Sequence, residues 1–168
     1  MAIAHELLRL GDQSRQLYLF DTFEGMTAPG DEDYHYTGTP ASVLKERHEK
    51  GGKVWNAVPL EEVRRAVLST GYEAAQVHFV KGRVEDTLPQ QAPNTIALLR
   101  LDTDWYESTK HELMTLFPRI TPGGILIIDD YGHFAGARKA VDEYIRKYRV
   151  KILLDRADYS GRIGVVQP

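Results

Sequence analysis

Ile96-Ala-Leu-Leu-Arg-Leu-Asp-Thr-Asp104 and Ile125-Leu-Ile-Ile-Asp-Asp130 are two short apolar stretches that each end in two aspartates. Nearly continuous apolar runs of this length are typical of strands buried on both faces of a parallel sheet. Between the two runs, apolar residues at helical spacing predict a helix over about residues 107–117. A strand, a helix and a second strand in this order indicate a βαβ unit.

The same alternation of helix and strand signals extends over most of the chain. Periodicity and helix-terminating residues predict helices over residues 3–10, 42–49, 59–70 and 136–148. Short apolar runs predict strands over residues 16–20, 77–81, 151–154 and 162–166. A turn joins the last two strands, which indicates an antiparallel hairpin at the sheet's edge. We therefore predict one domain over residues 1–168, with an α/β, Rossmann-like, mostly parallel sheet and helices on both faces.

Composition excludes several kinds of site and partner. The 168 residues are 42% hydrophobic and carry a net charge of -3, with acids and bases interspersed. This charge gives no reason to expect nucleic acid or an anionic membrane as a partner. The chain contains no cysteine, so thiolate metal ligands and cysteine nucleophiles are excluded. Residues 1–6 lack the pattern of a signal peptide and the longest apolar run is too short to span a bilayer, so we expect a cytoplasmic protein.

The four aspartates at the ends of the two apolar runs are expected to converge. Ligands of open α/β sheets bind beyond the carboxyl ends of the strands, and consecutive strands of a βαβ unit are often neighbours. Two like charges about 4 Å apart repel by about 4 kcal/mol near a protein surface. A divalent cation with oxygen ligands is the simplest way to offset this repulsion. The alternative is that these acids are solvated loop residues or helix N-caps. Asp104 or Thr103 would then cap the helix that begins near Trp105, and Asp130 would cap the next helix.

Other side chains at the same edge have two possible roles. Asp21 ends the first strand, where nucleotide-binding α/β folds place an acid that accepts hydrogen bonds from ribose hydroxyls. Glu85 and Asp86 follow the strand over residues 77–81, where they either line that cofactor pocket or form a solvated turn. The aromatic residues near the acids either form a pocket wall or pack in the core, and His133 is either a substrate contact or a surface histidine. These aromatic residues are Trp105, Tyr106, Tyr131 and Phe134.

Several motifs together resemble a known family. They are Tyr18-Leu-Phe-Asp-Thr-Phe-Glu-Gly-Met26, Val84-Glu-Asp-Thr-Leu-Pro89, Leu98-Leu-Arg-Leu-Asp-Thr-Asp-Trp-Tyr-Glu-Ser-Thr109, Gly123-Gly-Ile-Leu-Ile-Ile-Asp-Asp-Tyr-Gly132 and Ala137-Arg-Lys-Ala-Val-Asp-Glu-Tyr144. From about residue 8 to residue 166 the chain resembles the macrocin/mycinamicin-type O-methyltransferases. These are metal-dependent, class I S-adenosylmethionine methyltransferases.

The resemblance implies a function and a set of site residues. The expected reaction is O-methylation of a hydroxyl on a small molecule, either a sugar or a phenolic natural product, with S-adenosylmethionine and Mg²⁺ as cofactors. Asp104 is then the general base that takes the proton of the acceptor hydroxyl. The metal ligands implied are Asp102, Asp129 and Asp130. The cofactor-binding residues implied are Asp21 at the ribose, with Glu85 and Asp86 near the adenine.

One feature of that family is missing from this sequence. Its members carry a strand and a glycine-rich turn ahead of the first helix, and this chain begins inside what would be that helix. We therefore expect a sheet that lacks its first strand and glycine loop. The unpaired sheet edges predict a homo-oligomer that covers them.

Two other functions fit parts of the pattern. The chain is either the methyltransferase or a truncated, non-catalytic, metal-binding remnant of that family. A Mg²⁺-dependent phosphatase also uses an Asp-x-Asp motif after a strand. Its nucleophile normally ends the first strand of the domain, however, and Asp102 follows at least two earlier strands.

Overall fold

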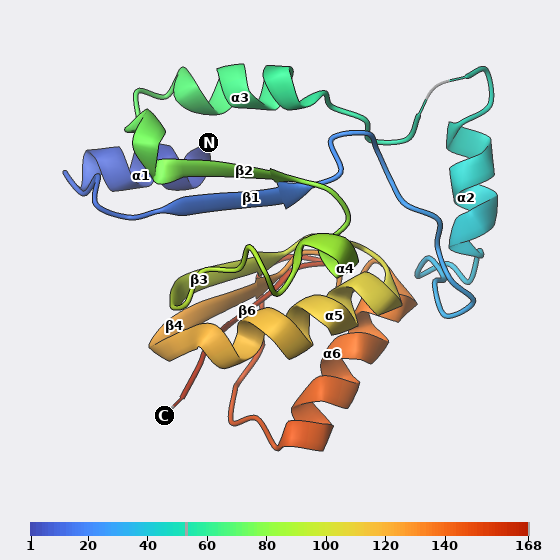
Figure 1. The fold of residues 1–168 in the computed structure, drawn as a ribbon. Helices are drawn as coiled ribbons and strands as arrows, with labels where there is room; N and C mark the ends of the chain where they lie inside the picture. Colours follow the sequence, from blue (N-terminus) through green and yellow to red (C-terminus); the bar gives the residue numbers. More distant parts are fainter. Residues whose placement is uncertain (53, 168) are drawn as a thin grey trace.

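A computed structural model describes residues 1–52 and 54–167 of the chain (Figure 1). The helices are α1 (Ala2–Arg9), α2 (Ala41–His48), α3 (Leu60–Leu68), α4 (Val84–Thr87), α5 (Tyr106–Leu116) and α6 (Ala135–Tyr148). The strands are β1 (Leu17–Asp21), β2 (Val77–Lys81), β3 (Ile96–Leu101), β4 (Ile120–Ile128), β5 (Asp155–Arg156) and β6 (Arg162–Val165). Two 3₁₀ turns, Ala74–Gln76 and Phe117–Arg119, precede β2 and β4.

The strands form two separate sheets. β1 pairs in parallel with β2, and a second sheet has the order β3-β4-β6-β5. In that sheet β3 and β4 are parallel, whereas β6 is antiparallel to both β4 and β5. The predicted parallel βαβ unit and C-terminal hairpin are therefore confirmed. Among the described residues no ladder joins β1 to β3, so these two strands each keep an unpaired edge. Homo-oligomerisation stays a prediction.

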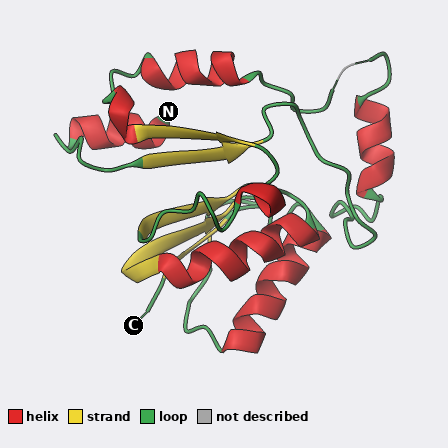
Figure 2. Ribbon diagram, in the orientation of Figure 1, coloured by secondary structure: helices red, strands yellow, loops and turns green. Residues whose placement is uncertain are grey.

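Helices lie on opposite sides of the strands (Figures 1 and 2). α1 and α3 lie on one side, where Ala4, Val67 and Val77 form a small core with the inner face of β1 and β2. α5 and α6 lie on the other side, beneath β3 and β4. There a larger core includes Leu113 and Leu126, both 1% exposed. The predicted α/β arrangement with helices on both faces is thus confirmed.

Two predicted strands differ from the structure. β4 begins at Ile120 rather than at residue 125, because Thr121-Pro122-Gly123-Gly124 continues the strand through an irregular register instead of ending the helix before it. The strand expected over residues 151–154 is wrong. In the C-terminal hairpin, the first residue of β5 that pairs with β6 is Asp155, opposite Ile163. Residues 151–154 therefore lie outside the strand. Leu153 in that segment is 84% exposed.

A helix able to cross a membrane would need about 20 apolar residues. None of the helices formed by residues 1–52 and 54–167 meets this requirement in length and apolarity.

Candidate active site

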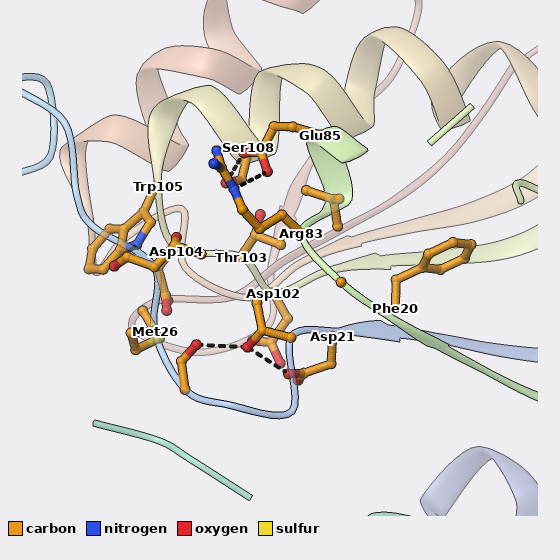
Figure 3. A pocket seen from close by; sticks show the side chains of 15 residues that line it. Phe20, Asp21, Met26, Arg83, Glu85, Asp102, Thr103, Asp104, Trp105 and Ser108 are labelled. Atoms are coloured by element: carbon orange, nitrogen blue, oxygen red, sulfur yellow. Dashed lines mark hydrogen bonds and ion pairs between the residues drawn. The ribbon is translucent and has the colours of Figure 1, made fainter. Parts of the chain in front are cut away.

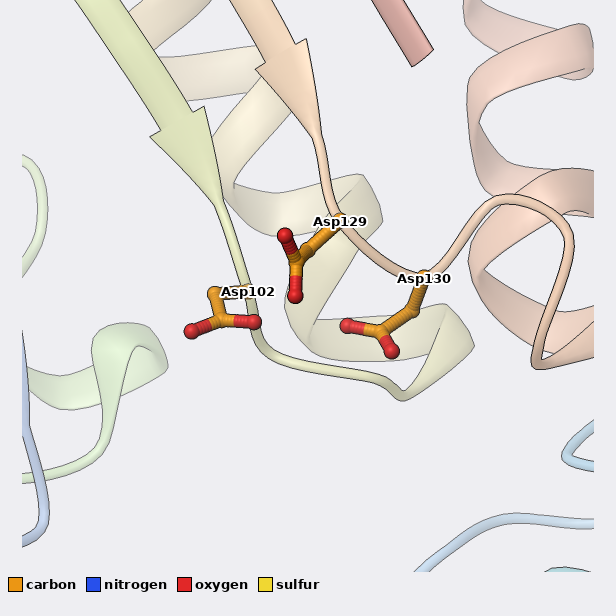
Figure 4. A group of neighbouring side chains, drawn as sticks. All are labelled: Asp102, Asp129 and Asp130. Carbon is orange, nitrogen blue, oxygen red and sulfur yellow. The ribbon is translucent and has the colours of Figure 1, made fainter. Parts of the chain in front are cut away.

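Three aspartates meet where β3 and β4 end (Figure 4). Leu101 and Ile128 are paired at the ends of these strands, so the residues that follow them are level. The next residues are Asp102 on one chain segment and Asp129 and Asp130 on the other. One carboxylate oxygen from each aspartate lies within 4.8 Å of one from both of the others. The sequence therefore correctly placed these three acids together.

Arg100 supplies the nearest positive charge. Its side chain forms a 2.6 Å ion pair with Oδ2 of Asp102 and a 3.1 Å ion pair with Oδ1 of Asp129. Arg100 precedes Asp102 by two residues in an extended strand, so both side chains point to the same side. The guanidinium thus offsets part of the repulsion between two of the acids.

Asp130 has no such partner. Its Oδ2 is buried, and no N–H or O–H donor of the described residues is hydrogen-bonded to it. Burial, followed by the charge of Asp129, raises the pKa of Asp130 despite the opposing effect of a hydrogen bond with Asp104. Burial also raises the pKa of Asp102, against the effect of Arg100. A shared proton or a cation is needed to satisfy this cluster.

Asp104 occupies a strained position next to the cluster. Its φ is 62°, in the left-handed region, and the N–H of Trp105 donates to the carbonyl of Thr103 at 2.7 Å. Asp104 is therefore the central residue of a three-residue turn, a conformation that costs about 1–3 kcal/mol. Burial, and then a hydrogen bond to Asp130, raise the pKa of Asp104. Burial and the neighbouring acid thus favour the neutral form of Asp104.

The alternative that these acids cap the following helices is wrong. Trp105 precedes α5 and Phe134 precedes α6, and neither helix has a side-chain hydrogen bond at its N-cap. The free N–H of Tyr106 instead donates to Oδ1 of Asp33, at 2.8 Å. Asp33 is 3% exposed and comes from the loop before α2, far from α5 in sequence. The carboxylates of Asp104 and Asp130 remain available for other contacts.

A cavity of about 100 Å³ adjoins these acids (Figure 3). Its wall includes the ends of β1, β2 and β3, so the two sheets meet there. Two predicted cofactor residues, Asp21 and Glu85, lie in this wall with the predicted ligand Asp102 and the predicted base Asp104, whereas Asp129 and Asp130 do not. Among the residues in this wall are Asp21, Gly25, Glu85, Asp102, Asp104 and Ser108.

The predicted cofactor residues are not all in this wall. Asp21 is exposed and its Oδ1 accepts the N–H of Phe23 at 2.6 Å, which supports the turn after β1. Oε1 of Glu85 accepts the hydroxyl of Ser108 at 2.7 Å. Its Oε2 is buried without a hydrogen bond, although Nε of Arg83 lies 3.4 Å away. Asp86 is exposed on α4, outside the cavity wall.

The aromatic residues near the acids divide between core and surface. Trp105 and Phe134 are 2% and 3% exposed and pack edge to face with ring centroids 5.0 Å apart. Core packing is therefore their main role, although Trp105 also borders the cavity. His133 lies in a surface group of rings, where its Nδ1 is 2.9 Å from the hydroxyl of Tyr159.

Two buried acids near the site could not be identified from the sequence. Asp33 lies in a loop with other acids, and Glu112 lies in a helix, where a glutamate is ordinarily solvated. Glu112 is 6% exposed and its Oε2 accepts the hydroxyl of Thr103 at 2.8 Å. The spacing of Ser108 and Glu112 in α5 puts both on the inner face. That spacing is the one signal the sequence offered.

Comparison with known proteins connects this site to a family. The family model described as "Macrocin-O-methyltransferase (TylF)" matches residues 1–163. A curated relative from Streptomyces olivaceus, named "8-demethyl-8-(2,3-dimethoxy-alpha-L-rhamnosyl)-tetracenomycin-C 4'-O-methyltransferase", is 39% identical over 151 residues, covering 90% of this chain and 55% of that protein. The "Demethyldecarbamoylnovobiocin O-methyltransferase" of Streptomyces niveus is 35% identical over 156 residues, covering 92% and 57%.

A solved structure agrees with these sequence relatives. The protein titled "Structure of the O-methyltransferase NovP" superimposes with a TM-score of 0.80 and 32% identity, over 96% of this chain and 64% of that chain. This chain thus spans a little over half the length of the curated relatives it matches.

Proposed function

This chain belongs to the macrocin O-methyltransferase (TylF) family, and we propose that it acts in S-adenosylmethionine- and Mg²⁺-dependent methylation of a hydroxyl on a small natural product. The observation that carries the proposal is the convergence of Asp102, Asp129 and Asp130 with Asp104 beside them. The three carboxylates are the ligands in the proposal, and Asp104 is the base.

The residues fit a magnesium ion. Mg²⁺ prefers carboxylate oxygens, and it commonly combines one or two carboxylates with water and substrate oxygens. The buried Oδ2 of Asp130 lacks a hydrogen bond among the described residues, and such an atom is suited to face a cation. When bound, Mg²⁺ would lower the pKa of a coordinated acceptor hydroxyl.

The residues also fit part of S-adenosylmethionine. Asp21 and Glu85 lie at or just beyond the carboxyl ends of the parallel strands β1 and β2 and border one cavity, and each has oxygens that accept hydrogen bonds. The unpaired Oε2 of Glu85 is available to a donor from the cofactor. Burial raises the pKa of Glu85, but the hydrogen bond from Ser108 and the charge of Arg83 outweigh this effect and lower it. Glu85 therefore stays ionised and can accept a hydrogen bond. S-adenosylmethionine, when bound, supplies the sulfonium methyl group.

Asp104 is placed to handle the proton of the reaction. S-adenosylmethionine would supply the methyl group for the acceptor oxygen, and Asp104 would accept the proton that this hydroxyl loses. Asp104 must be ionised at that moment. Its raised pKa makes it a stronger base than an exposed aspartate, which favours proton transfer near neutral pH.

The relatives suggest the class of acceptor. The relative from Streptomyces olivaceus carries a rhamnosyl 4'-O-methyltransferase name, so we propose a sugar hydroxyl on a natural-product glycoside, with a phenol as the alternative. The loop over residues 27–40 and the ring group around His133 lie near this side of the site. His35 and His133 from these two segments have ring centroids 4.7 Å apart.

Calorimetry and a transfer assay test the proposal. We expect S-adenosylmethionine to bind in the presence of Mg²⁺, and labelled methyl to reach a glycoside hydroxyl. Asp104→Asn should lower transfer by about 10²–10⁴-fold, the usual contribution of a general base, without abolishing Mg²⁺ binding. Binding of Mg²⁺ without any binding of S-adenosylmethionine would instead identify this chain as a non-catalytic, metal-binding member of the family.

A further inference from the structure

Glu112 is a buried carboxyl group that the proposed reaction does not use. It lies on the inner face of α5, 6% exposed. Burial raises the pKa of Glu112 to about 8, and the charges of Glu85 and Asp102 add to the rise. A buried carboxyl group lowers stability unless a compensating contact holds it. Its contacts therefore indicate what it does.

The contact of Glu112 is with the segment that carries the site. Its Oε2 accepts a hydrogen bond of 2.8 Å from the hydroxyl of Thr103. The hydroxyl of Thr109, which is 2% exposed, lies 3.4 Å from the same Thr103 oxygen. Thr103 stands between Asp102 and Asp104. Glu112 thus contacts the residue that joins a proposed metal ligand, Asp102, to the proposed base, Asp104.

The turn that Thr103 belongs to needs support from its surroundings. Asp104 has a positive φ of 62°, a conformation that costs energy outside glycine and persists when the surroundings hold it. On the far side of the turn, Asp33 accepts the N–H of Tyr106 at 2.8 Å. On the near side, the bond from Thr103 to Glu112 is the buried side-chain contact that fixes the turn. The turn is therefore held at both ends by buried acids.

We propose that Glu112 is a positioning residue, which through Thr103 holds Asp102 and Asp104 in the arrangement that binds Mg²⁺ and accepts the proton. The proposal rests on the proposed function of these two aspartates. Glu112 acts as a hydrogen-bond acceptor, and a neutral group can accept as well as an ionised one. A glutamine, which keeps a carbonyl oxygen at the same place, should therefore replace it.

Mg²⁺ calorimetry on the 168-residue chain tests the proposal. Glu112→Leu keeps the size but removes the acceptor, and it should weaken Mg²⁺ binding by about tenfold, the lower end of the usual effect of groups that orient metal ligands. Glu112→Gln should stay within about twofold of wild type. Glu107→Leu, at an exposed position of the same helix, is the matched control and should also stay within about twofold.

A second pair of variants tests the link through Thr103. Thr103→Val removes the donor and leaves Glu112 in place, so it should weaken Mg²⁺ binding as much as Glu112→Leu does. The double variant should be no weaker than either single one, because both remove the same bond. Thr103→Val also serves if Glu112→Leu does not fold.

The backbone chemical shifts of Asp104 give a readout without metal, because they report its φ of 62°. In Glu112→Leu and Thr103→Val these shifts should move away from their wild-type values, whereas they should not move in Glu112→Gln. Unchanged Mg²⁺ affinity and unchanged Asp104 shifts in Glu112→Leu and Thr103→Val would overturn the proposal, and so would an equal loss in Glu112→Gln. If the wild-type chain bound no Mg²⁺, the proposed metal function would fail, and the Asp104 shifts would still decide the role of Glu112.

Discussion

The acids after β3 and β4 lie over a large buried core, whereas the acids after β1 and β2 lie over a smaller one. Beneath the first group, side chains from β3, β4, α5 and α6 pack together. Beneath the second, Val67 and Val77 are buried but most of the surrounding leucines are only partly covered. Asp102 and Asp104 of the first group border the same cavity as Asp21 and Glu85 of the second.

The two regions also hold their acids differently. Near β3 and β4, buried acids such as Asp33 and Glu112 fix the backbone, and burial raises the pKa of Asp102, Asp104 and Asp130. Near β1, Asp21 is exposed and supports a local turn. Acids that repel one another at close range require a rigid platform, and a single exposed acceptor does not. The difference indicates that the proposed metal side is held more rigidly by the protein than the proposed cofactor side.

A matched pair of leucine truncations tests the difference in packing. Leu126→Ala removes a side chain that is 1% exposed in the larger core, and it should lower the free energy of unfolding by about 2–5 kcal/mol. Leu19→Ala removes a partly covered side chain of β1 and should cost about 1–2 kcal/mol. Urea titration followed by circular dichroism measures both. Equal losses would show that the two regions are equally well packed.

The pH dependence of stability tests the buried acid beneath the metal side. The pKa of Glu112 is raised from an ordinary 4.5 to about 8, so the folded chain binds its proton more tightly than the unfolded chain. The resulting stability is complete below pH 4.5 and is lost as the pH rises through about 8. Each unit of pKa difference corresponds to about 1.4 kcal/mol.

Glu112→Gln provides the comparison for this pH effect. In the presence of a chelator, wild type should lose up to about 4 kcal/mol more stability between pH 5 and pH 8 than the variant does. The other ionisable groups are the same in both proteins, so their contributions cancel. Parallel pH profiles for the two proteins would contradict a raised pKa at Glu112.

Replacing Arg100 should raise Mg²⁺ affinity, whereas the other substitutions near the proposed metal site should lower it. Its guanidinium pairs with Asp102 and Asp129, so it competes with a cation for the same oxygens. Charges about 4 Å apart interact by about 1–4 kcal/mol. Arg100→Gln should therefore raise Mg²⁺ affinity about tenfold at pH 8, measured by calorimetry, and lower the stability of the metal-free chain. A fall in Mg²⁺ affinity would show that Arg100 assists the metal.

The sequence predicted the parts of the molecule whose signals are local. Continuous apolar runs identified β3 and the end of β4, and the order of strands placed Asp102 beside Asp129. It could not reveal Asp33, because the N–H it accepts lies 73 residues away, at Tyr106. It missed Glu112 because a helical glutamate has the same pattern whether it is buried or solvated.

The errors in the strands have a similar origin. Residues 151–154 have the composition of a strand, but the hairpin turn fixes a register in which Asp155 is the first residue paired. Gly123 and Gly124 ordinarily end regular structure. Here Gly123 donates its N–H to the carbonyl of Val166 and Val166 donates to Gly124, both at 2.9 Å, which keeps this segment in the sheet. In both segments, pairing with residues distant in the sequence determines where the strand begins, and local composition does not encode this pairing.

Mg²⁺ calorimetry on Asp129→Ala tests the proposed metal site most directly. Groups that only orient a metal ligand typically contribute about 10–100-fold to affinity, so loss of a ligand should weaken Mg²⁺ binding by more than about 100-fold. Glu61→Ala, at an acid on α3 whose side chain is 76% exposed, should leave the affinity unchanged. Equal Mg²⁺ affinity in Asp129→Ala and wild type would contradict a metal site formed by Asp102, Asp129 and Asp130.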